Sequence, residues 1–226
     1  MGLTLYIVAA SVRPPDVPAD CLESFPMEQF QALAHPWWVN LLIMVPAAAY
    51  FLWRRDGLEI TLGRKLVIAA FALTFGFVEA AVVVYLRAAL GLLPGFKSGT
   101  LAEVQRLSAG YQQVLSLTRF PPSLFAIELL REAATMLMLV LTALLAAPRT
   151  RERLASFLWA FAVWDLAYYA SLWATVRWPT SLKEIDILFL IPVPWVAQVW
   201  YPLLVSALTL LAVSLTKTRA GRPAAG

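Results

Sequence analysis

The sequence predicts an all-α fold, a polytopic integral membrane bundle of about five transmembrane helices that occupies residues 37–216. Of the 226 residues, 61% are hydrophobic and 14% are charged, and the mean hydropathy is +0.72, far from the average of soluble domains. The apolar residues form long continuous runs instead of the alternating pattern of barrel strands. The charged residues gather at the ends of these runs, as they do at membrane boundaries.

Five apolar runs predict the five helices in order. Residues 37–53 form a first run of about 17 residues, at the short end of what a bilayer core requires, with tryptophan at both ends. The second, third and fourth runs, 66–86, 122–147 and 154–176, are each long enough to cross a bilayer. The fifth run, 187–216, would extend about 45 Å as one straight helix, which is too long for a single crossing.

The sequence predicts that the last helix is kinked. Ser181 and Glu184 have the spacing of a capping box, which predicts a helix that begins just before the fifth run. Three prolines then lie within the run, at Pro192, Pro194 and Pro202. Each proline lacks a backbone N–H and crowds the carbonyl four residues earlier, so the helix is expected to bend at these positions.

The distribution of Lys and Arg predicts the orientation in the membrane. Segments 54–65, 149–153 and 217–226 are short and hold four, three and three basic residues, whereas seven are spread over longer segments on the opposite side. The positive-inside rule then makes the basic tail 217–226 cytoplasmic, and it makes the N-terminal segment 1–36 and an outer loop at 88–121 extracytoplasmic. A six-crossing or an inverted arrangement is the alternative.

Acidic side chains inside the apolar runs predict the functional site, because a carboxylate in a membrane is costly unless it is paired or functional. There are four of them: Glu79, Glu128, Glu132 and Asp165. Glu128, Arg131 and Glu132 share one helix face by their i, i+3, i+4 spacing.

A second polar face completes the predicted pocket. Asp165 shares its face with Tyr168 and Tyr169, and Asp186 stands at the start of the fifth run. The predicted site therefore comprises Glu79, Glu128, Arg131, Glu132, Asp165, Tyr168, Tyr169 and Asp186. These residues are expected to meet in the middle to outer half of the bilayer.

The balance of charge predicts what such a pocket binds. Arg131 and Arg87 can offset only two of the four acids, so protons or a bound cation must offset the rest. Carboxylates without imidazole or thiolate favour a hard divalent cation, whose ligands would be Glu79, Glu128, Glu132 and Asp165. The single histidine and single cysteine give no haem or zinc signature. The structural alternative is that protonated acids and ion pairs only hold the helices together.

Three functions remain open at this stage. The first is a small carrier or transporter subunit that uses the acids as a proton or cation site. The second is a membrane-embedded enzyme that acts on a lipid-like or isoprenoid substrate with paired carboxylates. The third is an accessory subunit of a larger membrane complex. The expected partners are the lipid bilayer and either further copies of the chain or other membrane subunits. No nucleic-acid partner is expected, because the basic residues form no stripe with interleaved aromatics.

Overall fold

The computed structural model describes residues 33–89 and 121–217, and this part of the chain is mostly helical. Its elements are, in order, the 3-10 helix η1 (Trp37–Ile43), α3 (Met44–Trp53), α4 (Leu62–Ala89), α7 (Pro122–Ala146), α8 (Thr150–Val176), β1 (Ile185–Phe189), β2 (Trp195–Gln198) and α9 (Trp200–Leu215). Most of the expected N-terminal segment, the outer loop and the basic tail lie outside the described residues.

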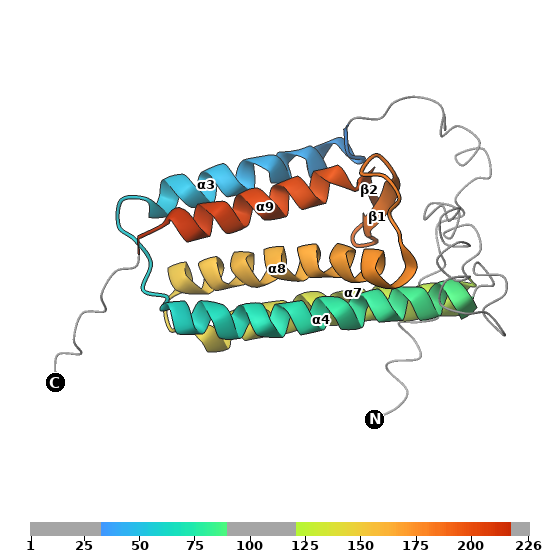
Figure 1. The fold of residues 1–226 in the computed structure, drawn as a ribbon, viewed down its shortest axis with the longest axis horizontal. Coiled ribbons are helices and arrows are strands. Elements are labelled where there is room, and N and C mark those ends of the chain that lie inside the picture. The colour runs from blue at the N-terminus through green and yellow to red at the C-terminus, as the bar shows by residue number, and fades with distance from the viewer. Residues whose placement is uncertain (1–32, 90–120, 218–226) are drawn as a thin grey trace.

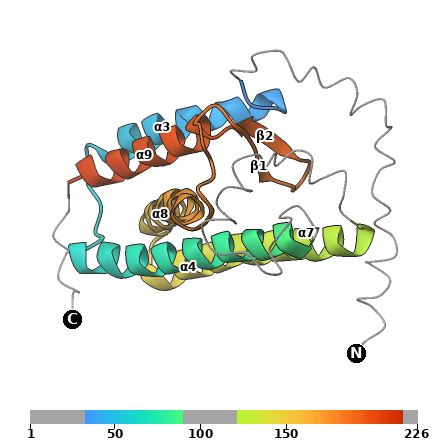
Figure 2. The ribbon, with the colours of Figure 1, turned by 45° about the vertical axis from the view of Figure 1, so that its right-hand side comes forward.

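Helix α8 lies at the centre of the bundle. Figures 1 and 2 show it between two pairs of helices, α3 with α9 on one side and α4 with α7 on the other. It packs against α4, α7 and α9, and α9 also packs against α3. The core therefore follows α8, where Leu172 and Ala160 are fully buried.

Of the helices in the described residues, two are long and apolar enough to cross a membrane. They are α4, with a mean hydropathy of 2.3 in its most apolar window, and α7, with 1.8. At 1.5 Å per residue their 28 and 25 residues extend about 42 Å and about 38 Å. Most of their apolar surface points away from the core, because only 33% and 22% of those windows are buried.

The predicted kinked helix at the end of the chain is wrong. Residues of the expected first half form an antiparallel hairpin of β1 and β2, which pairs Asp186 with Ala197, and α9 begins only at Trp200. Pro192 and Pro194 lie in the connection between the strands, where a missing N–H breaks no ladder bond. Pro202 lies in the first turn of α9, where no intrahelical N–H bond is required. The fold is therefore a helical bundle with a hairpin, not all-α.

The predicted capping box closes a turn instead of starting a helix. The Glu184 carboxylate accepts hydrogen bonds from the backbone N–H groups of Thr180, at 2.8 Å, and Ser181, at 3.1 Å. The N–H of Glu184 in turn donates to the carbonyl of Ser181 at 3.1 Å. Only the Glu184 half of the capping box forms, because the Ser181 hydroxyl accepts the N–H of Lys183 and not that of Glu184, and the residues that follow extend into β1.

Gly76 allows α4 to lie directly against α8. A Cβ atom at this position would lie 2.6 Å from the carbonyl oxygen of Trp164 and 2.8 Å from the Cβ of Ala167. Both distances are far below van der Waals contact. The absence of a side chain at Gly76 therefore sets how closely α4, with Glu79 one turn later, approaches the centre of the bundle.

Candidate functional site

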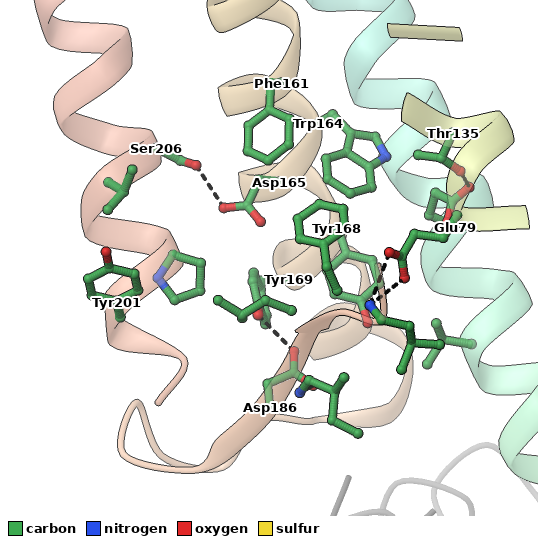
Figure 3. A pocket seen from close by; sticks show the side chains of 18 of the residues that line it. Glu79, Thr135, Phe161, Trp164, Asp165, Tyr168, Tyr169, Asp186, Tyr201 and Ser206 are labelled. Carbon is green, nitrogen blue, oxygen red and sulfur yellow. Dashed lines mark hydrogen bonds between the residues drawn. The ribbon is translucent and has the colours of Figure 1, made fainter. Parts of the chain in front are cut away.

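A cavity of about 120 Å³ lies among α4, α7, α8, α9 and the hairpin. Its polar lining consists of Glu79, Arg131, Glu132, Thr135, Asp165, Tyr168, Tyr169, Asp186, Tyr201 and Ser206. Figure 3 shows these side chains reaching the cavity from elements far apart in the sequence. Seven of the eight residues in the predicted site line this cavity; Glu128 does not.

Arg131 on α7 joins two acids. Its Nη1 atom forms an ion pair with Glu79 on α4, and its Nε atom lies 3.0 Å from both carboxylate oxygens of Glu128, one turn earlier on α7. The hydroxyl of Thr135 donates a second hydrogen bond to Glu79 at 2.7 Å. Glu79 and Glu128 therefore both have a cationic partner inside the bundle.

Glu132 has an unexpected partner, the backbone of the hairpin. Its carboxylate accepts hydrogen bonds from the N–H of Leu190, at 2.9 and 3.0 Å, and from the N–H of Ile191, at 3.1 Å. These two N–H groups follow β1, where the strand ladder ends. A carboxylate is a strong acceptor for such donors, so Glu132 attaches the end of the hairpin to α7.

Asp165 lies across the cavity from Glu79. It is buried in the middle of α8 and accepts one hydrogen bond from the hydroxyl of Ser206 on α9, at 2.8 Å. Figure 3 shows the Asp165 carboxylate pointing toward Ser206, with the rings of Trp164 and Tyr168 between it and Glu79. The Asp165 carboxyl forms no ion pair within the described residues, unlike Glu79 and Glu128.

Asp186 is placed by β1, outside the helices, and is fully enclosed. The hydroxyl of Tyr169 donates to its Oδ2 atom at 2.7 Å, and the N–H of Ile187 donates to Oδ1 at 2.8 Å. Burial raises the pKa of Asp186 to about 6, while the Tyr169 hydrogen bond and the positive charge of Arg87 act in the opposite direction. Asp186 thus has a pKa at which its charge changes in weakly acidic solution.

The predicted metal ligands Glu79, Glu128, Glu132 and Asp165 each have other partners, and the metal site stays a prediction. In the described ranges no group of three or more His, Cys, Asp or Glu side chains is arranged to hold a metal ion. The carboxylates face the same region but are separated by their individual partners: a guanidinium, two backbone N–H groups and a hydroxyl. Of these partners only the guanidinium of Arg131 carries a positive charge, so the four acids keep an excess of negative charge when all are ionised.

Aromatic side chains form the remaining wall, which sequence reasoning missed. Phe161 and Trp164 have ring centroids 5.5 Å apart, Trp164 and Tyr168 stack at 6.3 Å, and Phe189 of β1 lies 6.2 Å from Phe161. Phe161 lies four residues before Asp165 on the same face of α8 as Asp165 and Tyr168, and Tyr168 was already in the predicted site. Extending that face toward the N-terminus of the helix would have found Phe161, whereas Trp164 directly precedes Asp165 and lies on the neighbouring face, four residues before Tyr168.

The hydroxyl partners Thr135 and Ser206 were also missed. Thr135 lies one turn after Arg131, so the face of α7 that carries the acids already indicated it. Ser206 lies in an apolar helix with no acid of its own, and the sequence holds no signal for its pairing with Asp165. Comparisons of the chain with protein-family models, with curated proteins and with solved structures find no match, so the site is interpreted from its own geometry.

Proposed function

We propose that this protein is a multi-pass membrane protein that binds a proton or a small cation in its cavity and acts as a small carrier or a carrier subunit. The apolar surface of α4 and α7 supports the membrane placement. Large apolar side chains on these helices are more than half exposed: Leu66, Val67, Leu73, Phe77, Val78, Ile127, Leu130, Leu137 and Leu145. A surface of this kind is stable against lipid and not against water.

The ends of the helices support the proposed orientation. The basic segments 54–65 and 149–153 meet at one end of the bundle, where Arg149 pairs with Glu59 and Arg151 with Asp56. The carbonyl of Lys217 accepts the N–H of Leu58 at the same end. Three basic segments at one end are what the positive-inside rule associates with the cytoplasmic face.

One observation carries the proposed activity: four carboxyl groups and one guanidinium line a single cavity. Arg131 already pairs with Glu79, whereas Asp165 is buried with a hydroxyl as its hydrogen-bond donor. Ionising a carboxyl group in a poorly hydrated region is costly unless a positive charge accompanies it. Asp165 is therefore the position at which a proton or cation enters and leaves.

The composition of the cavity wall favours a carrier over an enzyme. Among the described residues that line the cavity there is no histidine or cysteine, and their one serine hydroxyl, that of Ser206, donates to Asp165. A nucleophile with an adjacent imidazole base, the usual arrangement for acyl transfer, is not formed by these residues. The cavity lies between helices well inside the bundle, as substrate sites of membrane carriers do.

Proton flux into proteoliposomes tests the proposal. The full-length protein is reconstituted around a trapped pH-sensitive dye, and a potassium diffusion potential drives uptake. We expect a protein-dependent flux that Asp165→Asn reduces at least tenfold. Asp56→Asn is the matched control, because it makes the same change in an exposed ion pair at the end of the bundle. Flux that is equal in all three proteins, or absent from the unmodified one, rejects the proposed function.

A further inference from the structure

Asp165 is covered by the protein, so part of the cavity wall has to move before a cation from solution can reach it. Asp165 is 8% exposed, and its hydrogen-bond donor Ser206 is 2% exposed, although both residues line the cavity. Close packing of protein interiors leaves few openings as large as a water molecule, and a hydrated ion is larger still. The proposed function therefore requires an element of the wall that opens.

The β1–β2 hairpin is the part of the wall that can move most easily. Most of the remaining wall belongs to the helices α4, α7, α8 and α9, three of which pack against α8. The hairpin contributes residues 186–190, and Figure 3 shows it with Asp186 along one side of the cavity. Its ladder has four paired positions, with an irregularity between Ile187 and Phe189. A two-stranded hairpin is marginally stable by itself, so its position depends on what holds it.

One end of the hairpin is fixed to α9. Strand β2 ends at Gln198, and α9 begins two residues later. The N–H of Val199, between them, donates to the carbonyl of Glu184 at 2.9 Å. Two backbone hydrogen bonds, at 2.7 and 2.8 Å, also join Val196 of β2 to His35. Because backbone bonds fix this end on two sides, it can act as the hinge of a moving hairpin.

The other end of the hairpin is held to α7 by one side chain. Figure 2 shows the hairpin between α9 and α7. The Glu132 carboxylate accepts the N–H groups of Leu190 and Ile191 at 2.9 to 3.1 Å, and residues 191–194 beyond them are exposed. Such charge-assisted hydrogen bonds are strong, but they depend on the charge and position of a single carboxylate. Loss of this attachment would release the whole tip.

We propose that the hairpin is a lid on the cavity, with its hinge at α9 and with the Glu132 carboxylate holding its tip closed against α7. Release of Leu190 and Ile191 moves residues 186–190 away from the cavity. The cavity then opens at the end of the bundle opposite the basic segments 54–65 and 149–153. This inference rests on the proposed function and adds the route by which the cation reaches Asp165.

The reaction rate of a thiol inside the cavity measures how often the lid opens. The full-length protein carries Ser206→Cys in a Cys21→Ser background and is placed in nanodiscs. Its reaction with 2-aminoethyl methanethiosulfonate is followed by mass spectrometry. We expect Glu132→Gln to raise the rate about fivefold, because weaker hydrogen bonds to Leu190 and Ile191 increase the population of the open state.

Two matched controls separate opening of the lid from general loosening of the bundle. Glu128→Gln makes the same change one turn earlier on α7, in an acid that pairs with Arg131, and should leave the rate unchanged. Ser156→Cys places the thiol at a position that is 1% exposed near the opposite end of α8. Glu132→Gln should not change the reaction rate of that thiol. Circular dichroism checks that each variant is folded.

A second pair of variants tests the lid independently of Glu132. Tyr169→Phe removes the hydroxyl that donates to Asp186 of β1 at 2.7 Å, and it should also raise the rate at Ser206→Cys. Tyr201→Phe removes a hydroxyl that donates at the same distance of 2.7 Å to the carbonyl of Val39, outside the hairpin. We expect Tyr201→Phe to leave the rate unchanged.

The outcomes distinguish this inference from the proposed function. Equal rates at Ser206→Cys with and without Glu132→Gln and Tyr169→Phe overturn the lid, and so does an equal rise at Ser156→Cys. The labelling requires no transport, so proton flux that depends on Asp165 leaves the proposed function in place when the lid fails. Faster labelling in Glu132→Gln without any protein-dependent flux supports the lid and rejects the proposed function.

Discussion

At the scale of single residues, the partners of the acids determine what each one does. Glu79 and Glu128 share the positive charge of Arg131, and Glu132 binds backbone N–H groups of the hairpin. Among the described residues Asp165 accepts a hydrogen bond from one hydroxyl and has no cationic partner. This difference is why we propose Asp165, and not the other acids, as the group that exchanges a proton or cation.

We expect Glu132 to stabilise the hairpin and not to bind the proton or cation in the cavity. Glu132→Gln removes the negative charge and replaces the second acceptor of the Leu190 N–H with an NH₂ group, so the remaining uncharged oxygen forms weaker hydrogen bonds to the N–H groups of Leu190 and Ile191. We expect a loss of about 1–3 kcal/mol of stability and faster hydrogen exchange at these two amides. Glu59→Gln, in a more exposed ion pair, is the control. Unchanged exchange at Leu190 and Ile191 would show that Glu132 does not hold the hairpin.

Asp186 should make stability depend on pH. Burial raises its pKa to about 6 in the folded protein from the ordinary 3.8 of an exposed aspartate, so folding takes up a proton between these values. Stability is then highest below about pH 4 and falls as pH rises to about 6, by about 3 kcal/mol in total. Asp186→Asn should remove this dependence. The thermal unfolding midpoint at pH 5 and pH 8 measures it, and an equal difference in both proteins would contradict the assignment.

At the scale of elements, the contact between α4 and α8 places the acids of two helices around one cavity. Because Gly76 has no side chain, the backbone of α8 can occupy the space that a Cβ atom at this position of α4 would fill. Glu79 follows one turn later and reaches Arg131 and Thr135 on α7. This contact lies well inside the bundle, because Glu79 is ten residues, or about 15 Å, from the C-terminal end of α4.

Gly76→Ala tests that contact, with Gly63→Ala as its matched control in the same helix. The added methyl at Gly76 would overlap Trp164 and Ala167, whereas nothing lies within 4 Å of the corresponding position at Gly63. We expect Gly76→Ala to lose about 1–3 kcal/mol of stability through overpacking. Gly63→Ala should gain up to about 1 kcal/mol through helix propensity. Equal thermal unfolding midpoints for the two variants would contradict the close approach.

At the scale of the whole molecule, α8 connects the two ends of the bundle. Its N-terminal end lies with the basic segments 54–65 and 149–153, and its C-terminal end leads into the hairpin, as Figure 1 shows. The proposed orientation puts the first end in the cytoplasm and the hairpin outside. The cavity then lies nearer the outer surface, because Asp165 is eleven residues, or about 17 Å, from the end of α8 at Val176.

Labelling of introduced cysteines tests the orientation. In a Cys21→Ser background, Thr150→Cys and Leu182→Cys place thiols at exposed positions at opposite ends of the bundle. We expect an impermeant maleimide added to intact cells to label the second variant and not the first, and to label both after the membrane is permeabilised. Labelling of both variants in intact cells would show that α8 does not span the membrane in this way.

The sequence by itself determined that the chain is mostly helical and that it contains helices long and apolar enough to cross a membrane. Continuous apolar runs predicted helical segments, and two of them, α4 and α7, are helices long and apolar enough to cross a membrane. Helical spacing also placed Glu128, Arg131 and Glu132 on one face, and the Arg131–Glu128 contact follows from that spacing. These predictions succeed because length, hydropathy and helical period are local properties of the chain.

Only the tertiary structure decided which groups meet. The pairing of Asp165 with Ser206, of Glu132 with Leu190 and Ile191, and of Glu79 with Arg131 joins residues 41 to 59 positions apart. The period of a helix gives the face that a residue occupies but not the neighbour that the face meets. The hairpin likewise depends on pairing between two strands, and a short apolar run that contains prolines does not by itself distinguish a strand from a bent helix.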